Sequence, residues 1–291
     1  MKSAPFEYHA PTTTADAVAL LAGLGEGAKV LAGGQSLVPM LALRLAVFDH
    51  LVDVGRIAEL RGIERRADTL WVGAGTTQSV VGASAEVGAA VPLLARATAF
   101  IGHFQIRNRG TLGGSIAHAD PAGEYPAVAL ALDASMEVVS AGARRSIPAR
   151  DFFEGFWTTT MQADEILAGV TFPVWSGRCG FAIEEFARRH GDFAIAGAAV
   201  GVELGADDRI GRCGIGLIGL GSTPERAAAA EAAITGRPNA EIDPDEVGRL
   251  AMNGLESVPS DLNGSATYRT RVGAAMVARA WERAAAEALD A

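Results

Sequence analysis

The stretch that decides the fold is Gly102 to Pro126, with the sequence GHFQIRNRGTLGGSIAHADPAGEYP. Its centre, Thr111-Leu112-Gly113-Gly114-Ser115, holds two adjacent glycines with a hydroxyl residue on either side. Paired glycines allow a backbone to turn through conformations closed to other residues, so that successive N–H groups converge on an anion. The hydroxyls of Thr111 and Ser115 would add two donors. The sequence therefore predicts an anion-binding glycine turn here.

A second stretch of the same type lies far upstream, at Ala32-Gly33-Gly34-Gln35-Ser36. It follows a short apolar run, 29–31, and precedes the apolar segment 37–45, in which Leu37, Leu41 and Leu45 repeat on one helical face. A strand, a glycine turn and a helix in this order can hold a phosphate at the helix N-terminus. Either glycine pair alone is also ordinary turn chemistry. Two such turns in one chain predict a ligand with two linked phosphates, and a dinucleotide is the simplest candidate.

Four segments give the chain a resemblance to a known family. They are AGGQSLVPMLALRLA (32–46), IRNRGTLGGSIAHADPAGEYPA (106–127), RRHGDFAIAG (188–197) and Tyr268-Arg269 followed by a helix. Together they resemble the FAD-binding medium subunits of molybdenum hydroxylases, a family that includes carbon monoxide dehydrogenases, xanthine dehydrogenases and hydroxylases of nitrogen heterocycles. The resemblance covers nearly the whole chain. It implies that the dinucleotide is FAD and that the chain is an FAD-dependent oxidoreductase subunit.

The predicted elements form an α+β chain in two parts. Short strands and helices interleave before residue 173, and the segment 173–177, PVWSG, has the character of a linker. Beyond it we expect three strands and then three helices, at 181–186, 195–204, 210–220, 224–235, 244–255 and 268–289. The resemblance implies a two-part FAD-binding domain of the PCMH type over residues 1–176. It also implies a C-terminal flavoprotein domain of the carbon monoxide dehydrogenase type over residues 177–291, with a three-stranded antiparallel sheet and a helical bundle.

The amino-acid composition argues against several kinds of partner and cellular location. The net charge of −9, with no block of lysine or arginine, argues against a general nucleic-acid surface. The two cysteines, Cys179 and Cys213, are too few to ligate an iron–sulfur cluster, and we expect both to be small core residues. No apolar stretch is long enough for a membrane span, and the N-terminus lacks a signal-peptide core. A cytoplasmic location is the default expectation.

The resemblance assigns cofactor contacts residue by residue. The first pyrophosphate grip is Ala32, Gly33, Gly34, Gln35 and Ser36, and the second is Thr111, Gly113, Gly114 and Ser115. Glu124 matches an acid that hydrogen-bonds the sugar region, Leu167 a position whose backbone approaches the flavin, and Phe193 an aromatic beside the isoalloxazine. Each residue also has a simpler interpretation. Glu124 would be a solvated acid, Leu167 a core leucine, and Phe193 an aromatic that fills the core between domains. No catalytic residue is assigned, because a redox flavin needs binding, orientation and electrostatics from its protein.

Several charged residues near these segments receive no cofactor role. Relatives carry a lysine near Glu185, and a carboxylate there would oppose a reduced, anionic flavin, so that role is not transferred. Arg107 and Arg109 flank the second glycine pair, where they would brace the fold, pair with phosphate or pair with acids of a partner chain. The histidines His103, His118 and His190 have no cysteine or carboxylate at ligand spacing, so no metal ligand is predicted.

Three functions compete at this stage. The leading hypothesis is the FAD-carrying electron-transfer subunit of a heterotrimeric molybdenum hydroxylase. A large subunit would bind molybdopterin, a small subunit would bind [2Fe-2S] clusters, and quinone, NAD or oxygen would accept the electrons. The alternatives are a free-standing FAD oxidoreductase of the vanillyl-alcohol oxidase or MurNAc-reductase type, and a docking subunit without cofactor. Gln35 in place of a histidine slightly favours heterocycle hydroxylases over carbon monoxide dehydrogenases.

Overall fold

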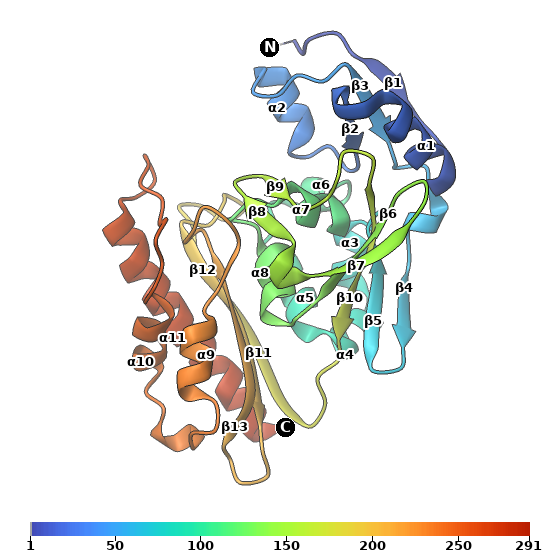
Figure 1. The fold of residues 1–291 in the computed structure, drawn as a ribbon. Coiled ribbons are helices and arrows are strands. Elements are labelled where there is room, and N and C mark those ends of the chain that lie inside the picture. The colour runs from blue at the N-terminus through green and yellow to red at the C-terminus, as the bar shows by residue number, and fades with distance from the viewer. Residues whose placement is uncertain (1) are drawn as a thin grey trace.

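The computed structural model describes residues 2–291, which form three main β-sheets with helices packed around them (Figure 1). The first sheet is parallel, with strand order β1-β3-β2, and its strands are β1 (Glu7–His9), β2 (Ala28–Leu31) and β3 (His50–Asp53). Figure 1 shows this small sheet, with its two helices, set apart at one end of the molecule above α6 and α7. The predicted α+β class is confirmed.

The first sheet carries the helices α1 (Thr14–Leu24) and α2 (Leu37–Leu43). Helix α1 begins after Thr13, whose side-chain oxygen accepts a hydrogen bond from the backbone N–H of Asp16 at 3.1 Å and caps the helix. Its buried face packs with Val52 of β3 in one apolar cluster that includes Ala17, Val18 and Leu21. Strand β2 then leads directly into the first glycine pair, as expected.

The second sheet is antiparallel, with strand order β4-β5-β10-β6-β7. Its strands are β4 (Ile63–Arg66), β5 (Thr69–Gly73), β6 (Ser135–Val139), β7 (Arg144–Pro148) and β10 (Ile166–Pro173). Between β5 and β6 the chain forms the helices α3 (Gln78–Ala83), α4 (Ala85–Ala90), α5 (Pro92–Thr98), α6 (Phe104–Arg107), α7 (Leu112–His118) and α8 (Glu124–Ala131). Helix α8 is buried almost throughout and forms the centre of the main apolar cluster.

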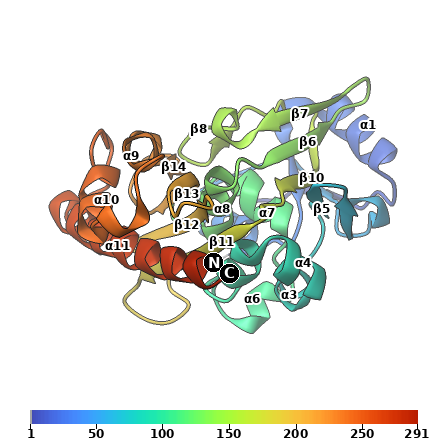
Figure 2. The ribbon, with the colours of Figure 1, turned by 90° about the horizontal axis from the view of Figure 1, so that it is seen from below.

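The third sheet is antiparallel, with strand order β11-β12-β13-β14. Its strands are β11 (Arg178–Phe186), β12 (Ala196–Leu204), β13 (Ile210–Ile218) and β14 (Glu225–Arg226), and the helices α9 (Ala228–Ile234), α10 (Pro244–Ala251) and α11 (Ala266–Asp290) follow. Figure 2 shows α11 lying across the face formed by β11 and β12. The three long strands are those predicted, and the two-residue strand β14 is an addition. The division at residue 176 stays a proposal.

The remaining elements are short. A two-stranded hairpin joins β8 (Phe153–Gly155) and β9 (Thr158–Thr159), and 3-10 helices occur at Gly25–Gly27, Ala58–Leu60, Ala149–Asp151 and Asn239–Glu241. Cys213 is buried in the core, and Cys179 is partly buried against the main cluster. Within residues 2–291, no helix combines the length and apolar character required to cross a bilayer.

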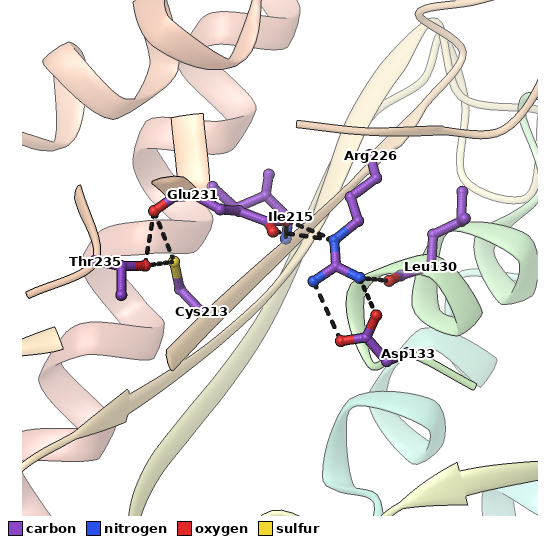
Figure 3. A network of polar contacts seen from close by, with 7 residues as sticks. All are labelled: Leu130, Asp133, Cys213, Ile215, Arg226, Glu231 and Thr235. Carbon is purple, nitrogen blue, oxygen red and sulfur yellow. Dashed lines mark hydrogen bonds and ion pairs between the residues drawn. The ribbon is translucent and has the colours of Figure 1, made fainter. Parts of the chain in front are cut away.

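A polar network joins the C-terminal sheet to helix α8 (Figure 3). Arg226 of β14 donates to the carbonyl of Leu130 at 2.9 Å and forms an ion pair with Asp133. Glu231 of α9 accepts from Arg226 at 3.0 Å and from the backbone N–H of Ile215 at 2.7 Å. The side chains of Arg226 and Glu231 are largely buried, so removing Arg226 would leave the Glu231 carboxylate without its ion-pair partner. The network therefore helps to fix how α8 and the third sheet meet.

Two sequence predictions about the glycine segments are wrong. Gly113 and Gly114 were expected in a turn, yet both lie inside helix α7, because Leu112 and Ile116 are buried four residues apart and Thr111 caps the helix. The apolar repeat from Leu37 to Leu45 was expected to form one helical face. Helix α2 instead ends at Leu43, since Arg44 adopts a left-handed conformation with φ 56°, and Leu45 is exposed.

Candidate functional site

The first glycine loop presents a row of backbone donors. No backbone N–H from Gly33 to Leu37 donates to an acceptor among residues 2–291. Gly34 has φ 73°, a conformation that favours glycine, and it turns the chain from β2 into α2. The Gln35 side chain donates to the carbonyl of Gly33 at 3.0 Å and braces the turn from within. Unpaired N–H groups in a glycine loop before a helix suit the oxygens of a phosphate.

The second glycine pair uses its backbone differently. The N–H of Leu112 donates to Thr76 at 3.0 Å, and that of Gly113 donates to Ala74 at 2.9 Å. The side chain of Thr111 accepts from the N–H of Gly114 at 2.9 Å, and its carbonyl accepts from Ser115. All four N–H groups at the start of α7 are therefore satisfied inside the chain. The predicted N–H nest is absent from this segment, and its donors for a ligand would be the hydroxyls of Thr111 and Ser115.

The two glycine segments touch each other, although they lie about eighty residues apart in the sequence. A Cβ added at Gly33 would stand 2.2 Å from the carbonyl oxygen of Arg109 and 2.8 Å from the Cα of Gly110. A Cβ added at Gly114 would stand 3.4 Å from the Cβ of Ala32. The backbones approach so closely that only glycine fits at position 33. The two segments that the sequence predicts to bind one ligand therefore lie side by side. In Figure 1 this place is between α2 and α7.

The third family-like segment, 188–197, contacts the loop before α6 through histidines. The rings of His103 and His190 lie 5.9 Å apart, and a Cβ added at Gly191 would meet the His103 ring at 2.7 Å. His103 directly precedes helix α6, which leads into the second glycine pair. Phe193 lies just beyond this contact and is 69% exposed. Its exposure excludes the interpretation that Phe193 fills the core between domains.

Two carboxylates influence each other electrostatically where helix α8 packs on the third sheet. Glu124 begins α8, and burial raises its pKa to about 8, with the negative charge of Glu185 adding to the rise. Glu185 lies on β11, and burial raises its pKa to about 7. One carboxylate oxygen of Glu185 is buried and has no hydrogen-bond partner among residues 2–291. The structure thus rejects a fully solvated Glu124 and places an unassigned acid beside it.

The remaining predicted site residues divide between the site and the core. Leu167 lies on β10 beside an irregularity in the pairing with β6 and is buried, as a core leucine would be. Arg107 donates to the carbonyls of Ile101 and Gly102 at 2.9 Å, so it braces the loop before α6. His118, at the end of α7, has its pKa lowered by burial. It lies 3.8 Å from Asp120 and is part of no cluster of three metal-ligating groups within residues 2–291.

Sequence reasoning missed an aromatic that packs at the end of α7. Trp157 stacks on His118 with ring centroids 5.5 Å apart, and its indole N–H donates to Asp120 at 3.3 Å. Trp157 has φ 55° in the tight β8-β9 hairpin and lies against Phe156, which is exposed. Two adjacent aromatics between glycine and threonine were the available signal. Their contact with α7 depends on a fold that brings residues about forty apart together.

A cavity near these elements lies apart from the residues predicted to contact FAD. It has a volume of about 330 Å³ and lies among α3, α5 and α6, where its lining is Ser79, Gly82, Ala83, Ala95, Thr98, Ala99, Phe104, Arg107 and Asn108. None of the residues predicted to contact FAD lines this cavity. The candidate site is therefore the junction of the first loop with α7, and its chemistry is that of neutral N–H and hydroxyl donors.

Comparison with known proteins gives matches over almost the entire chain. Residues 4–175 match the family described as the FAD binding domain in molybdopterin dehydrogenase. Residues 181–284 match the CO dehydrogenase flavoprotein C-terminal domain.

Curated relatives match the chain from end to end. The carbon monoxide dehydrogenase medium chain of Hydrogenophaga pseudoflava is 38% identical over 284 residues, covering 96% of this chain and 98% of the relative. The 6-hydroxypseudooxynicotine dehydrogenase complex subunit alpha of Paenarthrobacter nicotinovorans is also 38% identical, covering 98% and 96%. A solved carbon monoxide dehydrogenase from Hydrogenophaga pseudoflava superposes with a TM-score of 0.95, at 39% identity over 99% of both chains.

Proposed function

The chain belongs to the family of FAD-binding medium subunits of molybdenum hydroxylases, and from this premise we propose that it carries electrons between iron–sulfur clusters on a partner chain and an external acceptor. It is an FAD-binding oxidoreductase subunit. The observation that carries the proposal is the direct contact between the first glycine loop and the segment before α7. That contact joins an open row of N–H donors to two hydroxyls at one location.

The residues of this site fit FAD by their donor chemistry. The N–H groups from Gly33 to Leu37 would hold the pyrophosphate, with the hydroxyls of Ser36, Thr111 and Ser115 as further donors. A side chain at Gly33 would fill the space that the two backbones already share. The uncharged residues of the two segments would define the shape of the phosphate-binding site. They are Ala32, Gly34, Gln35, Gly113 and Gly114. Gly113 and Gly114 contribute as helix-packing residues, since their N–H groups are already paired.

Other residues would orient the rest of the cofactor. Glu124 would accept hydrogen bonds from the sugar region, the backbone at Leu167 would approach the ring, and Phe193 would lie beside it. Because Phe193 is exposed, it can pack on a planar ring without leaving the core. When bound, FAD supplies the capacity to take up electrons singly and release them singly or in pairs.

Partner chains would supply the other redox centres. The described residues hold two free cysteines, in different clusters, so an iron–sulfur cluster would require another subunit. We propose a small subunit with [2Fe-2S] clusters and a large subunit with molybdopterin, assembled as a heterotrimer in the cytoplasm. The substrate would react on the large subunit, and the external acceptor would be a quinone, NAD or oxygen. Domains 1–176 and 177–291 would enclose the FAD between them.

Titration of the purified full chain with FAD tests the cofactor assignment. We expect stoichiometric uptake that quenches or shifts flavin fluorescence, and we expect Gly33→Val to abolish it while the circular dichroism spectrum stays native. Gly23→Ala is the matched control, because a Cβ at this position in α1 meets nothing within 4 Å. A chain that assembles with partners yet takes up no FAD would be a docking subunit.

Reconstitution with partner subunits tests the electron-transfer assignment. In the assembled complex, substrate should bleach the flavin absorbance, whereas the isolated FAD-loaded chain should not respond to substrate. Substrate turnover by the isolated chain would instead identify a free-standing FAD oxidoreductase. FAD uptake and flavin reduction are measured in separate experiments. The FAD-binding assignment and the electron-transfer assignment can therefore be contradicted independently.

A further inference from the structure

Three potential metal ligands gather on one face of the first sheet. Glu7 and His9 lie two residues apart on β1, so their side chains point to the same face of the strand. The parallel register pairs Glu7 with His50 of β3, which places the His50 side chain on that face as well. The ligand atoms of Glu7, His9 and His50 all lie within 4.8 Å of one another.

The separations match those between ligands of one small metal ion. The Nε2 of His9 lies 3.3 Å from the Nδ1 of His50, and this Nδ1 lies 3.6 Å from a carboxylate oxygen of Glu7. For metal–nitrogen bonds of about 2.0–2.1 Å, two corners of a tetrahedron stand about 3.3–3.4 Å apart. The two imidazole nitrogens already have this separation, and a small movement of the Glu7 side chain would bring its oxygen to it.

The donor set selects the class of ion. Two imidazoles and one carboxylate suit zinc and neighbouring transition metals, whereas calcium and magnesium prefer ligand sets built only from oxygen. Both histidines are partly buried, while the Glu7 side chain is 75% exposed, so water can reach a fourth coordination position. His50 shares its row of the sheet with buried Ala28, and an apolar neighbour on that side would limit exchange with solvent.

We propose that Glu7, His9 and His50 bind a zinc-class divalent transition-metal ion that ties the edge strand β1 to β3. This proposal is independent of FAD binding, and it departs from the prediction of no metal ligand in the sequence. Strand β1 has three residues, and within residues 2–291 its one partner strand is β3, so the strand–strand contact is short. A metal ion held by both strands would fix that contact, because it bridges segments about forty residues apart.

The other histidines of the chain offer an internal contrast. His103 and His190 lie ring to ring at 5.9 Å, and His118 lies 3.8 Å from Asp120. Neither pair has a third ligand atom within the same reach among residues 2–291. Histidine proximity alone is therefore not what distinguishes the Glu7, His9 and His50 cluster. Without a metal, the 3.3 Å contact between His9 and His50 would be a simple hydrogen bond, and the experiment must separate the two cases.

Zinc titration of the full chain against a chromophoric chelator tests the proposal. We expect one equivalent of Zn²⁺ with micromolar or tighter affinity, at least a tenfold loss of affinity in His50→Ala and His9→Gln, and several-fold loss in Glu7→Gln. The double variant His103→Ala/His190→Ala is the matched control and should bind as the parent does. Absence of stoichiometric binding, or equal binding by the His50→Ala and parent chains, would overturn the proposal.

Two further readouts guard against a variant that merely misfolds. Zn²⁺ should raise the melting temperature of the parent chain and slow proteolysis near residues 7–9, and EDTA should reverse both effects. In His9→Gln, which keeps a polar side chain of similar size, the chelator-treated melting temperature should equal that of the parent while the zinc response disappears. A zinc response that persists in His9→Gln would contradict the assigned ligands. Co²⁺ bound to the parent should show ligand-field bands of nitrogen and oxygen coordination.

Discussion

Gly33-Gly34 and Gly113-Gly114 have the same residues and opposite backbone roles. In the first pair the N–H groups remain free to bind, whereas in the second they are bonded to Ala74 and Thr111 within the chain. The first pair lies in a loop, and the second lies inside helix α7. The same two residues can therefore act in two ways. One glycine pair leaves its N–H groups free to bind a ligand, and the other lets a helix pack closely on its neighbours.

The two roles have different energetic consequences. A glycine that faces a ligand can be changed at the expense of binding while the fold survives. A glycine that lies between a helix and a strand end is part of the core, and a side chain there overpacks it. Three substitutions in and around the glycine pairs test this division, and a fourth, at Glu185, provides a contrast away from both pairs.

The largest effect on stability is expected for Gly113→Ala. The new Cβ would stand 2.3 Å from the Cβ of Ala74 and 2.7 Å from its Cα, so the backbone itself would have to move. We expect the free energy of unfolding to fall by about 2–3 kcal/mol in chemical denaturation. Gly88→Ala on α4, where nothing lies within 4 Å, should be neutral or stabilising by up to about 1 kcal/mol. Equal behaviour of the two variants would contradict the packing role.

The complementary effect is expected for Gly33→Ala. A Cβ 2.2 Å from the carbonyl of Arg109 would push the first loop away from α7 and separate the two halves of the grip. We expect FAD affinity to fall about 10- to 100-fold, or about 1.4–2.8 kcal/mol, in a fluorescence titration. The free energy of unfolding should fall by less than in Gly113→Ala, because Gly33 lies in a partly exposed loop that can move away from α7, whereas Gly113 is buried. If Gly33→Ala instead lost stability and kept its FAD affinity, Gly33 would have the packing role that we assign to Gly113.

A smaller effect is expected from the cap of α7. Thr111→Val removes the acceptor for the N–H of Gly114, which should lower the free energy of unfolding by about 1 kcal/mol, while Thr111→Ser should retain nearly all of it. Thr77 is the matched control, because it bridges to Thr111 and precedes α3 but makes no side-chain cap. Denaturation of Thr77→Val should show a loss of less than about 0.5 kcal/mol. An equal loss in both valine variants would argue against the cap.

The smallest effect concerns a charge at the domain junction, away from both pairs. The folded-state pKa of Glu185 is raised to about 7, so the unfolded chain releases this proton first as pH rises. The folded state then binds more protons between about pH 5 and about pH 7, and the free energy of unfolding falls as pH rises through this window. We expect Glu185→Gln to reduce that slope in denaturation curves at several pH values. Asp192→Asn, at an acid whose pKa is lowered by its bond to Arg189, should not reduce it.

Part of the site could be predicted because its signals are local. The order of β2, loop and α2 follows from a short apolar run, two glycines and an apolar segment. The second glycine pair was assigned to a turn because paired glycines favour turns on average. The buried spacing of Leu112 and Ile116 outweighed that preference once β5 lay alongside.

The sequence by itself determined the α+β class and the family, because the signals for both are written in continuous runs of residues. It also drew attention to the two glycine segments that we propose bind FAD. The tertiary structure alone decided that Gly33 packs against Arg109, that the charge of Glu185 raises the pKa of Glu124 and that His50 lies beside Glu7 and His9. Those contacts join residues forty or more positions apart. Their geometry depends on how sheets and helices pack, and no local propensity encodes it.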